Sequence, residues 1–555
     1  MKSFTKTILS LFFLVAVATS CKKPVPLQVK HIPKNATFVA VINTKALAVK
    51  MLANQATLEN IMKSAVGDDT SAAKGKQEWE DLQQSGLDLS SNFYLSFAQK
   101  DGGATMGKGS MIFAAIGTLN SEDKLEKYLK KKKPQAEIKK EKNYTYTTLD
   151  GGSMVAWSKD LVVAMNYQNA AGSQMEYDSA TGEFNIKPQA NSDASLKTEM
   201  DNYFTLKEDQ SVAAIPEFRD MMQNSSDASM WVNTASSMQS IPLPRVKELF
   251  GNSYMAATLN FEDGKVVVES KSYYSKEMKD LLKKYMTGEA NLGLVEKYPS
   301  ANINGFMVMA MNPEFVNDMV KQLELGGMAD AQLTKMMGSN YTLSDMLKAL
   351  KGDMAFIVSD FAGSSFKMIG DIAIGDKTQM NKLMDKLVEL KMMVKSPTGY
   401  FLNPEMSKGG FGVTVDDKNI LISNNDTVLN SFKSSTATAT IDKDVMSELK
   451  GKQVAAYVNL QSIINGLSKI PTTDTSMTAN IAKAKETFKD MRMYANKYDG
   501  KELTGHYELR LVNEKENSLA SLLKFAEAMS KTMNYKKEMK MEMPAGADSI
   551  PVSMR

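Results

Sequence analysis

The segments IFAAIG at 112–117 and DIAIG at 371–375 open the two stretches that decide the fold. Each apolar strand is followed by a helical segment, SEDKLEKYLKK at 121–131 or KTQMNKLMDKLVEL at 377–390, with apolar residues at i, i+3 and i+4. Two more strands close each stretch: MVAW (154–157) with LVVAMN (161–166), and FGVTV (411–415) with ILIS (420–423). We expect an α+β fold of antiparallel sheets with helices packed on one face.

The two stretches predict an internal duplication. Residues 111–166 align with 369–424 without gaps at an offset of 258 (369 − 111). Copies of one fold bury equivalent faces, so we expect equivalent apolar residues to be buried in both. These residues are Ile116, Leu125, Leu129 and Val155 in the first stretch, and Ile374, Leu383, Leu387 and Val413 in the second.

A shorter pattern also recurs. Asn-x-x-Asp-Gly-Lys occurs at 260–265 and at 496–501, and Asp-Gly favours a tight hairpin turn. A helical stretch follows each hairpin, so the chain reads as long, short, long and short segments. We place these segments at 32–210, 226–290, 300–435 and 450–532, with a flexible tail at 535–555.

Four apolar strands run into an asparagine that precedes a helix, at Asn43, Asn233, Asn312 and Asn459. Asparagine is favoured as the N-cap, because its side-chain oxygen accepts a backbone N–H of the first turn. We interpret the four residues as caps. The alternative is that they bind a ligand.

The N-terminus carries the pattern of a secretory signal over residues 1–20. Lys2 and Lys6 precede an apolar run at 8–18, and the small residues Thr19 and Ser20 follow it. The next residue, Cys21, is the only cysteine of the chain. This arrangement resembles the bacterial lipoprotein signal, although Ala18 replaces the usual leucine. The resemblance implies lipidation at Cys21, with residues 21–31 as a tether.

The residues after Cys21 bear on its location. Lys22, Lys23 and Pro24 include no acid, whereas surface-exported Bacteroidetes-type lipoproteins resemble one another in carrying acidic residues there. We therefore expect a lipid anchor in the outer membrane with the body facing the periplasm.

The order of segments, the stretch HIPKNATFVAVINTKALAVK at 31–50 and the lipoprotein start together resemble a known family. It is a family of Bacteroidetes-type lipoproteins catalogued as domain of unknown function 4836. The resemblance covers most of the chain. The family has no assigned activity, so the resemblance implies no functional residue.

Composition excludes several classes of function. A formal net charge of +3 gives no global field for nucleic acid. One cysteine allows no intramolecular disulfide, and two histidines exclude a His-rich or Cys-rich metal site. The 41 methionines are interpreted as core-filling residues. Trp157 and Trp231 lie in strand-like apolar runs, where burial is expected.

No nucleophile elbow, phosphate loop or dinucleotide fingerprint occurs in the sequence. In ELTGHYELRL (502–511), alternation places His506, Glu508 and Arg510 on one face and Tyr507 and Leu509 on the other. A His–Glu pair can act as a general base with its orienting carboxylate. We favour a solvated strand face carrying a charge ladder.

These observations favour a non-catalytic, membrane-anchored periplasmic lipoprotein that binds or scaffolds another envelope component. One alternative is a surface-exposed glycan- or peptide-binding lipoprotein. The other is a hydrolase without a recognisable motif. We expect no cofactor and no metal, and we expect the membrane, reached through acyl chains, and an unknown envelope protein or glycan as partners.

Overall fold

The computed structural model describes residues 25–52, 77–78, 80–100, 110–149, 152–169, 174–178, 183–187, 193–238, 244–338, 341–406, 410–434 and 439–542. The chain divides into two compact units. Unit 1 comprises Met1–Thr44 and Gln84–Val232, and unit 2 comprises Lys45–Gln83 and Asn233–Arg555.

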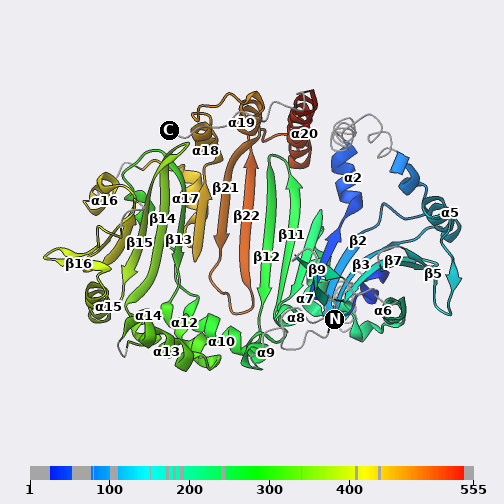
Figure 1. The fold of residues 1–555 in the computed structure, drawn as a ribbon, viewed down its shortest axis with the longest axis horizontal. Coiled ribbons are helices and arrows are strands. Elements are labelled where there is room, and N and C mark those ends of the chain that lie inside the picture. The colour runs from blue at the N-terminus through cyan, green and yellow to red at the C-terminus, as the bar shows by residue number, and fades with distance from the viewer. Residues whose placement is uncertain are drawn as a thin grey trace, which may run out of the picture. The chain divides into compact units, whose positions relative to one another are not determined.

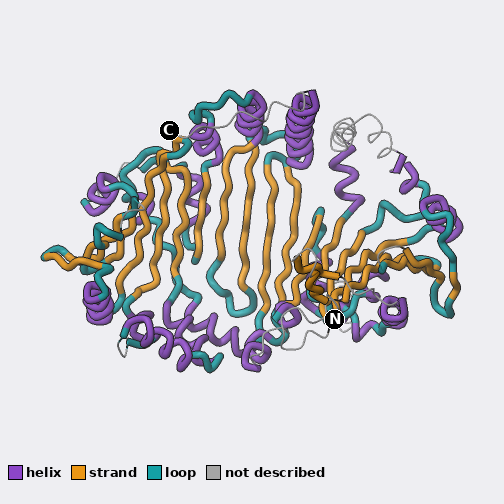
Figure 2. The backbone as a smooth tube through the Cα atoms, in the orientation of Figure 1, coloured by secondary structure: helices purple, strands orange, loops and turns teal. Residues whose placement is uncertain are grey.

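Unit 1 is built on an antiparallel sheet in the order β10-β1-β2-β3-β7-β6-β5-β4. Its strands are β1 (Phe38–Ile42), β2 (Phe93–Lys100), β3 (Ser110–Thr118), β4 (Lys139–Lys140), β5 (Thr145–Leu149), β6 (Ser153–Ser158), β7 (Leu161–Asn169) and β10 (Ala228–Asn233). A separate hairpin pairs β8 (Gln174–Asp178) with β9 (Glu183–Lys187). The main strands appear in Figures 1 and 2.

Helices pack against both faces of the unit 1 sheet. One face is covered by α6 (Asp193–Thr205) and α7 (Pro216–Gln223), where the Phe218 ring meets the fully buried Trp231 ring edge-on. The other face is covered near β6 and β7 by α5 (Glu122–Lys132), which buries Leu125 and Leu129 against Trp157. Ser121 caps α5 by accepting the Lys124 N–H.

Unit 2 is built on an antiparallel sheet in the order β11-β12-β22-β21-β20-β13-β14-β15-β19-β18-β17-β16. Its strands are β11 (Tyr254–Glu262), β12 (Lys265–Tyr273), β13 (Ile303–Ala310), β14 (Leu350–Ala362), β15 (Ser365–Ile374), β16 (Met393–Ser396), β17 (Gly399–Leu402), β18 (Gly412–Val415), β19 (Asn419–Ser423), β20 (Val454–Val458), β21 (Phe488–Ala495) and β22 (Leu503–Leu511).

The helices of unit 2 gather at the two ends of its strands (Figure 1). One end holds α18 (Leu460–Leu467), α19 (Thr475–Thr487) and α20 (Ser518–Glu542). The other end holds α9 (Pro244–Phe250), α10 (Lys276–Tyr285), α12 (Pro313–Gln322), α13 (Gly326–Met337) and α14 (Leu343–Lys348). The short α8 (Thr234–Ser237) precedes α9, and α2 (Thr44–Leu52) follows β1.

Helices also cover part of each face of the unit 2 sheet. On the core face, α11 (Gly293–Glu296), α16 (Asp426–Lys433) and α17 (Lys443–Leu449) pack over β13, β14, β15 and β20. On the other face, α15 (Lys377–Glu389) buries Met380 and Met384 against Val415. The predicted α+β class with antiparallel sheets is confirmed, but the helices lie on both faces, because each sheet is wide enough to carry a helix on either side.

The two sheets share an order of pairing. In unit 1 the order is β10-β1-β2-β3-β7-β6-β5-β4, and β20, β13, β14, β15, β19, β18, β17 and β16 repeat it in unit 2. A duplication as the origin of this repeat stays a prediction, as does the long–short–long–short order of segments.

The uniform offset of 258 is wrong for the first strand and the helix. Ile116 of β3 is buried and pairs with Val163 of β7. The residue of β19 that corresponds to Val163 is Leu421, and it pairs with Asp371 of β15. Asp371 is therefore the counterpart of Ile116. The offset is therefore 255 there (371 − 116), and the caps Ser121 and Asp376 agree with it. Only the closing strands follow 258.

The burial prediction holds unevenly. Ile116, Leu125, Leu129, Val155 and Ile374 are buried. Leu383, Leu387 and Val413 are only half-buried against the cluster under α15. The offset explains Leu383 and Leu387, because an offset of 255 pairs Leu125 and Leu129 with the buried Met380 and Met384. Val413 does correspond to Val155 and is less buried than it.

Three of the four predicted caps are confirmed: Asn233, Asn312 and Asn459 accept the N–H groups of Ser236, Glu314 and Ser462. Asn43 donates its side-chain amide to the Ser226 carbonyl at 3.0 Å. Each of the three caps satisfies a donor of a first helical turn.

The first Asp-Gly turn is as predicted, since Glu262 pairs with Lys265 around Gly264 at φ +68°. The second differs. Strand β21 ends at Ala495 and β22 begins at Leu503, so Asp499 and Gly500 lie in a wider loop, where the Asp499 carboxylate accepts two backbone N–H groups.

Two predicted boundaries need correction. Residues 27–31, assigned to the tether, form the 3₁₀-helix η1 (Leu27–His31). Val29 is fully buried, and His31 Nδ1 lies 2.9 Å from the Tyr203 carbonyl oxygen. The predicted flexible tail from 535 is helical up to Glu542, where α20 ends.

Candidate functional site: the two sides of strand β22

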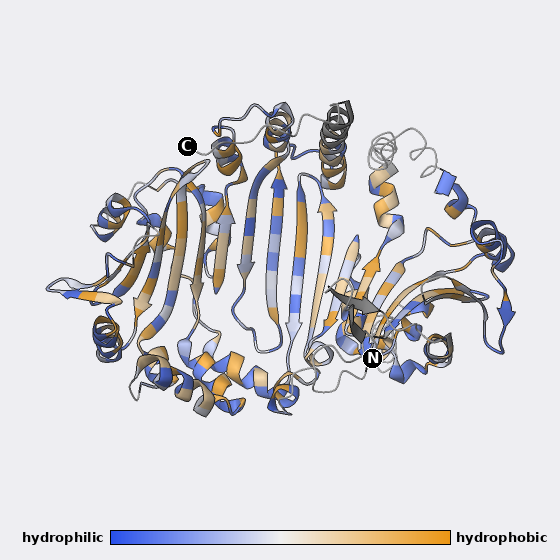
Figure 3. Cartoon of the chain, viewed as in Figure 1, coloured by the Kyte–Doolittle hydropathy of each residue, from blue (hydrophilic) through white to orange (hydrophobic). Residues whose placement is uncertain are grey.

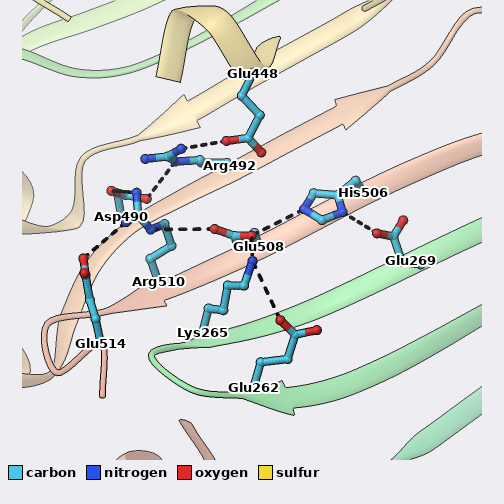
Figure 4. Close-up of polar contacts among 10 residues, drawn as sticks. All are labelled: Glu262, Lys265, Glu269, Glu448, Asp490, Arg492, His506, Glu508, Arg510 and Glu514. Carbon is cyan, nitrogen blue, oxygen red and sulfur yellow. Dashed lines mark hydrogen bonds and ion pairs between the residues drawn. The ribbon is translucent and has the colours of Figure 1, made fainter. Parts of the chain in front are cut away.

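A network of charged side chains lies on one side of β12, β21 and β22 (Figure 4). Strand β22 contributes His506, Glu508 and Arg510, which share a face because side chains alternate along a strand. The neighbouring strands add four charged side chains, and α17 adds Glu448. The four are Asp490 and Arg492 from β21 and Lys265 and Glu269 from β12.

Glu508 is the centre of the network. Lys265 Nζ donates to its Oε2 at 2.9 Å, His506 Nε2 lies 3.7 Å from the same oxygen, and Arg510 Nε lies 3.7 Å from Oε1. Burial favours the neutral acid, but the bonds from His506 and Lys265 outweigh it and lower the pKa of Glu508 to about 2. The Glu508 carboxylate is therefore ionised at neutral pH.

His506 is held between two carboxylates. Its Nδ1 lies 2.6 Å from Glu269 Oε1, and its Nε2 faces Glu508. The Tyr494 ring stacks on the imidazole at 4.8 Å. The contact with Glu508 raises the pKa of His506, against an opposing effect of burial. With both ring nitrogens engaged, this histidine cannot take up a substrate proton without giving up one of these contacts.

The second half of the network surrounds Arg492. Its Nη1 donates to Glu448 Oε2 at 2.6 Å, and its Nε lies 3.3 Å from Asp490 Oδ1. Arg510 Nη1 lies 3.7 Å from Asp490 Oδ2. The side chains of Arg492 and Asp490 are each 6% exposed, so these charges are buried in pairs.

The network offers one grouping of metal-ligating atoms among the described residues: Glu448, His506 and Glu508, with ligand atoms within 4.8 Å of one another. The carboxylate oxygens of Glu448 and Glu508 already contact Lys265, Arg492 and Arg510. A divalent cation there would face three fixed positive charges. The arrangement therefore fits an ion-pair network better than a metal centre.

The charge ladder on this face is as predicted, but the expectation that the face is solvated is wrong. The side chain of His506 is 11% exposed and that of Glu508 is 8% exposed. The ladder is shielded because the charges of three strands and α17 pack on one another.

The other side of β22 is apolar and partly exposed. Tyr507 is 46% exposed, and the same row across the sheet includes Met307 at 41% and Phe356 at 43%. We call this surface the open face. Figure 3 shows hydrophilic and hydrophobic residues alternating along β12 and β22, as two unlike sides require.

Three register rows across β11, β12, β22, β21, β20, β13 and β14 make up the open face. They are Leu259, Val268, Tyr507, Met493, Ala456, Met307 and Phe356; Phe261, Val266, Leu509, Met491, Val458, Gly305 and Val358; and Ala257, Ser270, Gly505, Ala495, Val454, Met309 and Met354. None of these residues is charged.

The other residues singled out in the sequence are accounted for as follows. Cys21 lies outside the described residues, so its lipidation stays a prediction. Trp157 and Trp231 are fully buried, as expected. Within the described part of the chain, none of the helices has the length and apolarity needed to cross a membrane.

Comparison with known proteins places the chain in a family. Residues 29–519 match the family described as domain of unknown function (DUF4836). The chain belongs to this family. No curated protein matches it. Similar solved structures include crystal forms III, IV and I of TP0453, at 10%, 9% and 9% identity and TM-scores of 0.25, 0.25 and 0.24. The matches cover 47%, 46% and 46% of this chain and 87%, 83% and 81% of those chains.

The open face escaped the sequence analysis, although a signal was present. Methionines alternate with other residues in FMVMA (306–310) and MRMYA (491–495), and period 2 places them on one face of each strand. The interpretation of methionine as core filler hid this signal. Met307, Met309, Met354, Met491 and Met493 all lie on the open face.

Proposed function

We propose that the chain is a lipid-anchored lipoprotein of the cell envelope that acts by binding, and that the open face of unit 2 is its binding surface. In this proposal Cys21 carries the acyl chains, the body faces the periplasm, and the partner is another envelope component with an apolar surface. The observation that carries the proposal is the exposed, charge-free row through Tyr507, Met307 and Phe356.

An exposed apolar surface of this extent is unusual for a protein that works alone. Monomeric soluble proteins rarely expose contiguous apolar patches larger than a few hundred Å². Single exposed apolar residues are common and need no explanation. Here Met307 and Phe356 adjoin each other on neighbouring strands, and Tyr507 lies in the same row beyond the half-buried Met493 and the buried Ala456. An uncharged stretch of this row with exposed side chains at both ends is typical of a surface that another molecule covers.

The position of the first described residues supports an anchor close to the body. Pro26 adjoins η1, whose Val29 is fully buried in unit 1. Five residue steps separate Cys21 from Pro26, and an extended chain spans at most about 17 Å over that length. A lipidated Cys21 would therefore hold the body near the membrane surface, where envelope components are found.

The anchor is tested by Cys21→Ala, with Lys23→Ala as a control that keeps the cysteine. We expect Cys21→Ala to move from the membrane fraction to the soluble fraction, because stable attachment requires the acyl chains. Retention of Cys21→Ala on membranes after a high-salt wash would contradict the anchor.

Protease treatment of intact cells tests the orientation of the body. Removal of the body by the protease would contradict a periplasmic position.

Binding through the open face is tested with Tyr507→Asp and Met328→Asp. Met328 is 66% exposed on α13 and lies off the open face. We expect an envelope component, a differently tagged second copy of this chain included, to copurify with the natural chain and with Met328→Asp, and to be lost with Tyr507→Asp. Recovery of the same components with all three chains would contradict a role of this face in binding.

A second candidate function is saccharide binding in a cavity at the start of α18. The cavity has a volume of 360 Å³ and is lined by Asn302, Phe361, Asn459, Gln461, Ser462, Asn465, Gly466 and Lys469. Amides and hydroxyls both donate and accept hydrogen bonds, as sugar hydroxyls require. Phe361 adds an apolar ring, so the lining favours a sugar over an apolar ligand.

Titration with an N-acetylglucosamine tetramer tests this candidate, with maltotetraose as the reference sugar. Asn465→Leu removes an amide from the cavity, and Asn403→Leu changes an asparagine elsewhere on the surface. We expect heat of binding that Asn465→Leu abolishes and Asn403→Leu retains. The absence of binding by either sugar would contradict the candidate.

A further inference from the structure

We infer that the occupant of the open face is a second copy of this chain, so that two unit 2 sheets pack face to face in a homodimer. The inference rests on the proposed role of the open face as a binding surface, and it names the partner. Three observations carry it: the size of the face, its relief and its lack of charge.

The size of the open face fits a dimer interface. Seven neighbouring strands form it, and strands lie about 4.8 Å apart with alternate residues about 7 Å apart along them. Three rows over this width give a flat area of about 700 Å². A stable interface buries about 800 Å² of accessible surface per partner, and side chains make the accessible surface larger than the flat area.

The relief of the face suits a partner of the same shape. Tyr507, Met307 and Phe356 project, each more than 40% exposed. Ala456 lies beside Met307 in the same row, and Gly305 lies in the adjacent row. Side chains of packed sheets interdigitate at a separation of about 10 Å. Projections of one copy therefore have hollows on the other to enter.

The lack of charge removes the usual obstacle to self-association. A twofold contact brings the same patch of each copy together, so a charge at its centre would face the same charge of the other copy and be repelled. The three rows contain no charged residue, and the charged network lies on the opposite side of β22. The five methionines can adjust their shape to a facing sheet.

Smaller apolar occupants fit the face less well. One acyl chain or one extended peptide is about as wide as a single strand spacing, about 5 Å. Either would leave most of the seven strands exposed. A facing sheet covers the whole width at once, which favours a second copy over a lipid or a peptide.

Sedimentation equilibrium of the Cys21→Ala chain tests the inference without the anchor. We expect a dimer at about 10 µM and a dimer about 100-fold weaker in Tyr507→Asp and Phe356→Asp, because each interface would then bury unpaired carboxylates. Met328→Asp should dimerise like the parent. Near-ultraviolet circular dichroism shows whether each variant keeps its fold. If one of the two Asp variants misfolds, the other still tests the interface.

A monomer at all concentrations up to about 100 µM would overturn the inference. So would a dimer that both Asp variants leave intact, because the contact would then lie elsewhere. A monomer that carries extractable lipid would also overturn it, in favour of acyl chains. The proposed function fails separately, if the copurified envelope components are the same for the natural chain and Tyr507→Asp.

The single cysteine of the natural chain allows a direct check of the geometry. In the Cys21→Ala background, Met493→Cys places one thiol near the centre of the open face. We expect a short bis-maleimide to link two copies through this residue and not through Met328→Cys. Linkage of Met328→Cys alone would overturn the face-to-face arrangement.

Discussion

The two sides of β22 reverse the usual relation between polarity and exposure. Towards one side the strand directs His506 and Glu508, whose side chains are 11% and 8% exposed. Towards the other it directs Tyr507, which is 46% exposed. The charged side is shielded because its charges are paired among themselves. The apolar side carries the exposed Tyr507, as expected in the isolated chain of a surface that we propose another molecule covers.

The comparison separates residues that stabilise the fold from residues that serve a partner. A buried charge is costly when its partner is removed, since the remaining charge is left without compensation. An exposed apolar residue contributes little to folding, because it stays in contact with water in the isolated chain. Substitutions on the two sides should therefore have opposite effects on stability and binding.

The largest expected effect on stability is that of Arg492→Ala on the charged side. It leaves Asp490 and Glu448 without their main cation and should lower the free energy of unfolding by about 3–5 kcal/mol. Urea unfolding followed by circular dichroism measures it. Arg245→Ala is the control, because Arg245 is 53% exposed in its pairs with Glu248 and Glu324 and should cost under about 1 kcal/mol. Equal effects of the two variants would contradict a buried network.

The next largest effect is the pH dependence set by Glu508 and His506. The pKa of Glu508 is lowered from 4.5 to about 2, so its contribution is present above pH 4.5 and is lost as pH falls towards 2. The pKa of His506 is raised above 6.5, so its contribution is present below pH 6.5 and is lost as pH rises through the folded pKa. Stability from the pair should peak between these limits.

Glu508→Gln should flatten this profile and lower the free energy of unfolding near pH 6 by about 2 kcal/mol. It should also lower the pKa of His506, which NMR can follow because the chain has only two histidines. Glu262→Gln is the control, since Glu262 is 47% exposed and 3.8 Å from Lys265. An unchanged histidine titration in Glu508→Gln would refute the contact.

The smallest expected effect on stability is on the open face. Tyr507→Ser should lower the free energy of unfolding by only about 1 kcal/mol when the Cys21→Ala chain is dilute enough to be monomeric, because about half of the ring is already in contact with water. The same urea titration measures it. A loss of 2 kcal/mol or more in the monomer, by analogy with core truncations, would mean that Tyr507 belongs to the core of the isolated chain.

The sequence predicted much of the fold and about half of this site. Periodicity identified the strand–helix–strand stretches, and three of the four asparagine caps followed from residue preference alone. Alternation also placed His506, Glu508 and Arg510 on one face. It could not say which face is covered, because that depends on α17 and β12, which come from distant parts of the chain.

The misjudged offset has a similar cause. Identical residue types paired Ile116 with Ile374 in the sequence alignment. In the structure, Ile116 pairs with Val163, and the corresponding pair is Asp371 with Leu421. Up to β5 in the first stretch and β17 in the second, corresponding residues differ by 255, as Thr147 and Leu402 do (402 − 147). From β6 and β18 onward they differ by 258, as Val155 and Val413 do (413 − 155). The extra residues lie between β17 and β18, and a loop insertion leaves no periodicity to detect.

Oxidation of methionines in cell envelopes tests the central claim most directly, namely that the open face is covered where the protein acts. Met307 on the open face is 41% exposed and Met328 off it is 66% exposed in the isolated chain. We predict that Met307 oxidises several-fold more slowly in envelopes holding the natural chain than in envelopes holding Tyr507→Asp, while Met328 reacts equally in both. Equal rates for Met307 in the two preparations would contradict the account.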